Sequence, residues 1–231
     1  MKIVFVSDIH NKFKKINIPD CDVLINAGDS TSRGYEYEVS NFAKWFGKTP
    51  ARHKISISGN HDFYFQTNPK ESRKILEDNG VIYLQDEEVV IDGIKFYGSP
   101  WQPWFHDWAF NFSKFDDGSQ AKHIWNKVPK DTDVLITHSP PKLIGDRVKN
   151  SGSRDPNVGC PYLLKKVLEV KPAFHVFGHI HECYGVHELS SAKEVTFVNA
   201  SCCTLHYEPT NKPIVFELSL EDERKRKKTQ L

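Results

Sequence analysis

The sequence lacks features that would place the chain in or across a membrane. None of its apolar runs approaches the roughly 18 residues that a spanning helix needs. Its N-terminus opens on a short apolar run, residues 3–6, without the basic, apolar and small-residue regions of a signal peptide. We therefore expect a soluble, cytoplasmic protein with no membrane partner.

Cysteine is scarce, and neither sign of charge dominates. The five cysteines include no CxxC pair, and the adjacent Cys202 and Cys203 cannot bridge each other without strain. Reduced thiols are therefore expected, as in cytosolic proteins. With 31 basic and 30 acidic residues, no overall field steers the chain toward nucleic acid, which stays an open but unfavoured partner.

The chain also has no internal repeat and no low-complexity linker. Its 231 residues fit a single domain, which we place at 1–220, followed by a charged tail at 221–231. The tail mixes acidic with basic residues, and we interpret it as a solvated, frayed end rather than a nucleic-acid arm.

What the sequence does contain is an alternation of strand and helix patterns. Helices are predicted at the amphipathic stretch 39–46, at 71–79 and at 160–170. Asp92-Gly93 is a strong hairpin signal between two short strands. Because hairpins and crossovers both occur, we predict an α/β fold with mixed sheets covered by helices. Buried strands are predicted at 3–6, 23–25, 55–57, 134–136 and 174–177.

A polar segment follows each of these buried strands. Open α/β sheets place their active sites at strand ends, so these segments are expected to meet. They combine carboxylate and amide oxygens with imidazoles, which suits manganese, iron, zinc or nickel better than calcium. The pattern predicts a dinuclear metal hydrolase. If His179 and His181 lay on a strand, their imidazoles would point to the same face, a feature that is ambiguous by itself. The segments are Asp8-Ile9-His10, Gly28-Asp29, Gly59-Asn60-His61-Asp62, Thr137-His138-Ser139 and Gly178-His179-Ile180-His181.

The order D-x-H, G-D, G-N-H-D, H and G-H-x-H resembles the calcineurin-like metallophosphoesterase superfamily over nearly the full length of the chain. Residues 98–105 and 137–141 further resemble the branch of vertebrate metallophosphoesterase-domain-containing brain proteins. The resemblance implies a four-layer α/β/β/α sandwich of two mixed sheets flanked by helices. It also implies cyclic-nucleotide phosphodiesterase activity, which members of that branch are associated with.

The same resemblance implies two divalent metal ions, with manganese first and iron, zinc or nickel as alternatives. Metals about 3.5 to 4 Å apart can hold a bridging hydroxide that attacks a phosphate clamped across both. The implied ligands are Asp8, His10 and His181 at the first metal, Asn60, His138 and His179 at the second, and Asp29 bridging the two.

Four residues are predicted to act on the substrate beside the metals. The resemblance makes His61 a substrate contact that could protonate the leaving alkoxide, and Asp62 could hold its other ring nitrogen. Asn60 is also assigned to substrate binding. Arg33 lies in a segment that resembles the GDxxDRG motif of related protein phosphatases, where the arginine binds phosphate. Since Ser32 replaces the second aspartate, Arg33 either touches the substrate or lies in a loop arranged differently.

A long aromatic loop at 99–119 permits two interpretations. Its rings either pack the loop onto the sheets or form a wall on which a base stacks. Trp104, with Phe105 and Trp108 as alternatives, is the predicted substrate contact.

The leading prediction is a phosphodiesterase or phosphomonoesterase of small nucleotides such as cyclic nucleotides. A metal-dependent nuclease is the second candidate, and a protein phosphatase or a non-catalytic scaffold is disfavoured. The oligomeric state is left open by the sequence.

Overall fold

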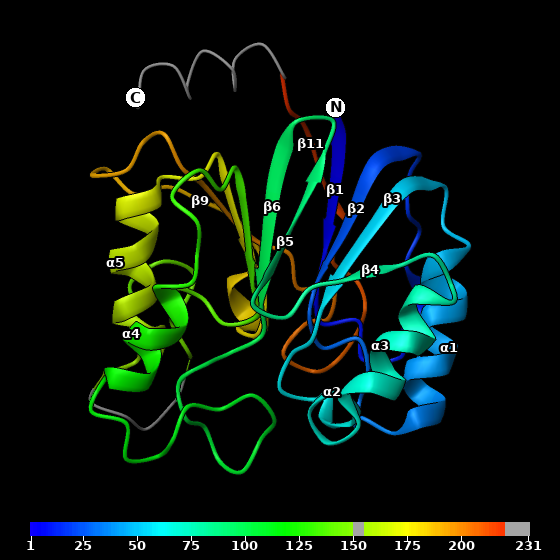
Figure 1. Ribbon diagram of the computed structural model, residues 1–231, viewed down its shortest axis with the longest axis horizontal. Coiled ribbons are helices and arrows are strands. Elements are labelled where there is room, and N and C mark those ends of the chain that lie inside the picture. The colour runs from blue at the N-terminus through cyan, green and yellow to red at the C-terminus, as the bar shows by residue number, and fades with distance from the viewer. Residues whose placement is uncertain (150–154, 220–231) are drawn as a thin grey trace.

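Two β-sheets pack face to face between helices in the computed structural model, which describes residues 1–149 and 155–219. Figure 1 shows α4 and α5 outside one sheet and α1, α2 and α3 outside the other. The predicted four-layer α/β/β/α architecture is therefore confirmed. The charged tail predicted at 221–231 lies outside the described residues.

The first sheet is built around parallel strands from the N-terminal part of the chain. Strands β1 to β4 run parallel to their neighbours, and β11 joins the edge antiparallel to β1. Paired residues such as Ile3 and Val23 are apolar on the inner face. The order is β11 (Ile214–Glu217), β1 (Lys2–Val6), β2 (Cys21–Ala27), β3 (Ala51–Ile57) and β4 (Ile82–Tyr83).

The second sheet has a parallel centre and an antiparallel strand at each edge. Asp92 and Gly93 both take positive φ angles, 51° and 83°, so the predicted hairpin turn between β5 and β6 is confirmed. The order is β5 (Glu87–Ile91), β6 (Ile94–Ser99), β7 (Val134–Thr137), β8 (Phe174–Phe177), β10 (Thr196–Asn199) and β9 (Gly185–His187).

The helices cover the outer faces of the sheets with apolar stripes. In α1, Val39, Phe42 and Phe46 are fully buried at helical spacing. No helix within the described ranges is both long and apolar enough to cross a membrane. The helices are α1 (Glu36–Gly47), α2 (Phe63–Thr67), α3 (Pro69–Glu77), α4 (Ser119–Trp125) and α5 (Pro161–Val170), with the short 3-10 turns η1 (Phe13–Lys15) and η2 (His181–Cys183).

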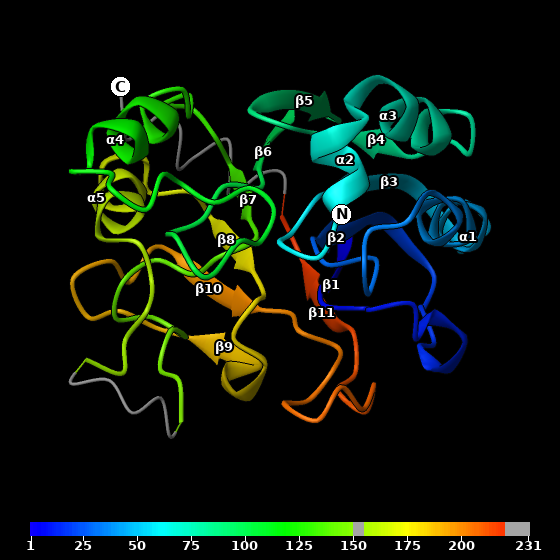
Figure 2. The same cartoon turned by 90° about the horizontal axis from the view of Figure 1, so that it is seen from below.

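Three apolar layers hold the sandwich together. The central layer lies between the sheets, where Phe5 and Phe174 pack at a ring distance of 5.5 Å. The two outer layers join the first sheet to α1 and α3 and the second sheet to α4 and α5. Because the parallel strands of each sheet run the same way, their carboxyl ends meet at one edge of the molecule. Figure 2 looks onto this edge and shows the loops that cross it.

Candidate metal centre

The polar segments that follow β1, β2, β3, β7 and β8 meet at this edge. His138 lies more than 100 residues from Asp8 and Asp29 in sequence, yet the ligand atoms of the three lie within 4.8 Å of one another. Two further groups of this kind are Asp8 with His10 and His181, and His10 with Asp29 and His61. The structure thus brings together the carboxylates and imidazoles that the sequence motifs marked out.

The backbone bends sharply where these side chains leave the strands. Asp8, His10, Asp29 and His179 all adopt left-handed conformations, with φ angles of 51°, 44°, 51° and 67°. Non-glycine residues in this region cost about 1–3 kcal/mol each, and such strain clusters at functional sites. Both sheets contribute such bends, since Asp8, His10 and Asp29 follow β1 and β2 of the first sheet and His179 follows β8 of the second.

His179 and His181 do not lie on a strand and do not share one face. Strand β8 ends at Phe177, and the bend at His179 separates the two rings. His179 points its Nδ1 at the Asn60 Oδ1, 2.8 Å away, whereas His181 points its Nε2 at the Asp8 Oδ1, 3.2 Å away. Each imidazole therefore serves a different half of the centre.

The first half contains Asp8, His10 and His181. The Nδ1 atoms of His10 and His181 face the carbonyl oxygens of Thr31 and Thr204, at 3.2 and 2.9 Å. A carbonyl only accepts, so each Nδ1 carries the ring proton. The two Nε2 atoms then face each other at 3.2 Å. Two facing lone pairs repel unless a cation or a proton lies between them.

The second half contains Asn60, His138 and His179. The Nδ1 of His138 donates to the carbonyl of Ala27 at 2.9 Å, which leaves its Nε2 facing the Asn60 Oδ1 at the same distance. The Asn60 oxygen also faces the Nδ1 of His179 at 2.8 Å. This is a second cluster of inward-facing lone pairs.

Asp29 lies between the two halves. Its Oδ2 is 3.4 Å from the Nε2 of His138 and 3.8 Å from the Nε2 of His10. Its Oδ1 accepts the backbone N–H of His61 at 2.8 Å, which fixes the carboxylate. One carboxylate thus contacts both clusters, as a bridging ligand must.

Buried carboxylates favour a positive charge in each half of the centre. Burial lowers the pKa of His10 to about 4 and that of His179 to about 3, so both rings are neutral lone-pair donors. Burial also opposes charge on His138, but Asp29 outweighs it and raises the pKa of His138 to about 9. Asp8 likewise raises the pKa of His181 against the effect of burial. In each half, a carboxylate thus favours positive charge on one imidazole, at a position where a cation fits.

His61 stands at the open side of the centre. Its side chain is 12% exposed, whereas those of His10 and His138 are at most 1% exposed. Its Nε2 lies 3.9 Å from the Asp29 Oδ2, and its ring packs 4.3 Å from the ring of Trp108. The imidazole therefore faces the open side of the centre, beside the candidate metal ligands.

The expectation that Asp62 holds the ring of His61 was wrong. The Nδ1 of His61 faces the carbonyl oxygen of Ser32 at 2.7 Å. The buried Asp62 carboxylate instead accepts from the backbone N–H groups of Thr31 and Gly59, at 2.9 and 2.8 Å. Asp62 directly precedes α2, but its side chain forms no cap hydrogen bond with that helix and bonds the 30–32 loop. Asp62 therefore supports the loop whose carbonyl orients His61.

A cavity of about 150 Å³ opens over the centre. Trp104 does not line it: its exposed ring faces a neighbouring hollow and lies under the ammonium of Lys114, and its substrate contact stays a prediction. Arg33 is exposed and also lies outside the lining. The lining residues are Asp29, Asn60, His61, Phe105, Trp108, His179, His181, Glu182, Leu205 and Tyr207.

The segment after β10 completes the site, and the sequence motifs missed it. The Ser201 hydroxyl donates to the Asp8 Oδ2 at 2.8 Å. The ring of Tyr207 packs 4.9 Å from that of His10 and 5.3 Å from that of His181. The only signal in the sequence was that this segment, like the others, follows a β-branched strand.

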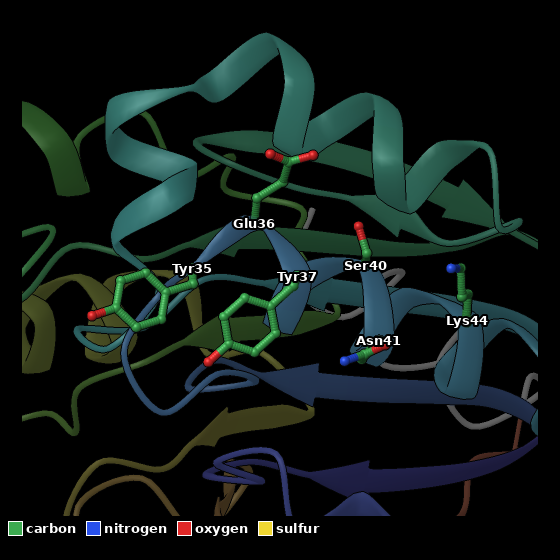
Figure 3. Close-up of a pocket in the computed structure, with 6 residues that line it drawn as sticks. All are labelled: Tyr35, Glu36, Tyr37, Ser40, Asn41 and Lys44. Carbon is green, nitrogen blue, oxygen red and sulfur yellow. The ribbon is translucent and has the colours of Figure 1, made fainter.

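A larger hollow of about 630 Å³ lies on the outer face of α1 (Figure 3). The rings of Tyr35 and Tyr37 stack there at 5.7 Å, beside Asn41 and Lys44. Its lining contains no imidazole and a single carboxylate, Glu36, so it lacks the chemistry of the metal centre despite its size.

Comparison with known proteins agrees with this geometry. Residues 1–183 match the family model of calcineurin-like phosphoesterases. Human Metallophosphoesterase domain-containing protein 1 is 41% identical, over 94% of this chain and 71% of that protein. A UPF0046 protein of Caenorhabditis elegans is 36% identical, over 94% and 74%. A phosphopantetheinyl hydrolase from Mycobacterium tuberculosis shares the fold at 12% identity, with a TM-score of 0.61 over 92% of this chain and 95% of that one.

The geometry of the centre indicates a metal site, and the family match identifies the reaction. The residues matched by the family model, 1–183, include every candidate ligand segment. The chain belongs to the calcineurin-like phosphoesterase family and is a metal-dependent phosphoester hydrolase.

Proposed function

We propose that the chain is a two-metal phosphodiesterase of small nucleotides, cyclic nucleotides foremost. The observation that carries this proposal is the pair of lone-pair clusters joined by the Asp29 carboxylate. Manganese is the proposed metal, with iron, zinc or nickel as alternatives. The proposed ligands are Asp8, His10 and His181 in one half, Asn60, His138 and His179 in the other, and Asp29 between them.

The proposed chemistry divides between the ions and the protein. When bound, a pair of divalent ions stabilises charge on the phosphoryl oxygens and activates a water. Asn60 ligates through a neutral oxygen and so limits the negative charge near the phosphate. The Nδ1–H of His61 donates to the Ser32 carbonyl, so its Nε2 is left to face the cavity. In its imidazolium form the ring gives the Nε2 proton to the leaving oxygen and becomes neutral.

The test uses the purified protein stripped with EDTA and reloaded with manganese, iron, zinc or nickel. We expect hydrolysis of 2′,3′- or 3′,5′-cyclic nucleotides to vanish on stripping and to return with metal, at two ions per chain. Nucleoside monophosphates and single-stranded DNA in the same panel separate a phosphomonoesterase or a nuclease. Full turnover by the stripped protein would refute the metal mechanism. The cytoplasmic location expected from the sequence remains a prediction.

A further inference from the structure

The cavity over the metal centre is too small to enclose a whole nucleotide. Pockets that bury drug-sized ligands measure about 300–1,000 Å³, whereas this cavity measures about 150 Å³. It therefore accommodates the phosphoryl group next to the ligands and leaves most of an ester substituent at the rim. The rim residues must then decide which substituents bind.

The rim is apolar and comes from two separate loops. Phe105, from the loop after β6, is 52% exposed, while Leu205 and Tyr207, from the loop after β10, are 53% and 44% exposed. Trp108 adds a half-buried ring beside His61. Exposed apolar side chains that gather around a cavity mark a binding surface. Flat aromatic rings of this kind favour a flat or apolar substituent.

The charge at the rim is negative. Glu182 lines the cavity, and its carboxylate accepts the backbone N–H of Lys149 at 2.9 Å. Among the residues that the structure describes, no lysine or arginine lines the cavity, and none forms an ion pair with Glu182. A second phosphate or carboxylate on the substrate would therefore meet a carboxylate and, within the described part of the chain, no lining cation.

We propose that the substrate is a phosphodiester with an apolar or aromatic alcohol and no second anionic group. Phe105, Leu205 and Tyr207 bind the alcohol, and Glu182 disfavours additional negative charge. This specificity rests on the phosphodiesterase function proposed above. It favours cyclic nucleosides without further phosphates over oligonucleotides, whose neighbouring phosphates would approach Glu182.

The apolar part is tested with two diesters that share a leaving group. Bis-p-nitrophenyl phosphate and methyl p-nitrophenyl phosphate both release p-nitrophenolate and differ only in the alcohol that is retained. We expect the protein to prefer the aryl diester, and Phe105→Ala to reduce that preference at least fivefold through KM. Phe115→Ala is the matched control, because Phe115 lies in the same loop, is 89% exposed and lines no part of the cavity.

The charge part is tested with 2′,3′-cyclic AMP and its 5′-phosphorylated form. Glu182→Gln should raise the ratio of kcat/KM for the phosphorylated substrate to that for the unphosphorylated one about two- to fivefold. Glu188→Gln, an exposed residue outside the lining, should leave this ratio unchanged. Metal content is measured in every variant.

The outcomes separate this inference from the proposed function. If no diester is hydrolysed by the metal-loaded protein, the proposed function fails. If diesters are hydrolysed but Phe105→Ala and Phe115→Ala show the same preference for the aryl over the methyl diester, the apolar rim does not select the substrate. An unchanged ratio in Glu182→Gln overturns the exclusion of a second anion.

Discussion

Replacing Asp62 by asparagine tests whether this carboxylate supports the 30–32 loop. The native Oδ1 accepts from the Thr31 N–H and from the hydroxyls of Ser30 and Thr31, at 2.9, 3.0 and 2.7 Å. The native Oδ2 accepts from the N–H groups of Gly59 and Ser30, at 2.8 and 3.3 Å. An asparagine must place its NH₂ at one of these two positions.

The orientation of the asparagine amide with the lower free energy places its NH₂ at the Oδ1 position. Both hydroxyls can rotate and accept from it, so only the Thr31 N–H loses its acceptor. The opposite orientation would leave two backbone N–H groups unpaired, on Gly59 and Ser30. One buried unpaired donor costs about 1–3 kcal/mol. We therefore expect Asp62→Asn to lower the free energy of unfolding by about 2 kcal/mol, or the Tm by about 4–8 °C for a chain of this size.

The same change should reduce activity through the loop. The Thr31 and Ser32 carbonyls orient the rings of His10 and His61, and misplacing a reacting group by about 1 Å can cost 10²-fold in rate. We expect kcat/KM to fall about 10- to 100-fold, measured beside thermal unfolding and metal content. Asp78→Asn is the control, since this exposed residue pairs only with Lys74 at the surface. An unchanged Tm in Asp62→Asn would refute the supporting role.

Three further changes test the centre and the core. Asp29→Ala should leave fewer than one metal per chain by elemental analysis, because one carboxylate serves both halves; two bound ions would contradict this. His61→Ala should keep the metals yet slow cyclic-nucleotide hydrolysis about 10²- to 10⁴-fold. It should have little effect on a p-nitrophenyl ester, because that leaving group needs no proton. Equal losses of rate on the two substrates would reject proton donation by His61. Burial lowers the pKa of His175 to about 3, below the unfolded value of 6.5. Below pH 6.5 the unfolded chain therefore takes up a proton at His175 that the folded chain does not, and the free energy of unfolding falls. The stability that the neutral His175 contributes is thus complete above pH 6.5 and is lost as the pH falls toward 3. Wild type should therefore lose about 2 kcal/mol more than His175→Phe between pH 7 and pH 5, measured by chemical unfolding at each pH, and parallel losses would refute this.

Much of the fold could be predicted from local patterns in the sequence. The β-branched runs at 3–6 and 134–136 became buried strands because their apolar side chains cover both faces of parallel sheet. Asp92-Gly93 formed its hairpin turn because both residues tolerate positive φ. The polar motifs at strand ends also converged, since parallel strands bring their carboxyl ends to one edge.

The directions of side chains after a strand could not be obtained in this way. The sequence alone showed which residues could ligate metal, because that depends on residue type and on the strand that precedes it. Only the tertiary structure showed that His179 and His181 contact different halves of the centre. Only it showed that Trp104 lies outside the cavity lining and that Asp62 bonds the 30–32 loop. It also brought Ser201 and Tyr207 to the centre from a distant segment. The physical reason is that left-handed bends and loop paths are set by packing between segments far apart in the chain, which no local pattern records.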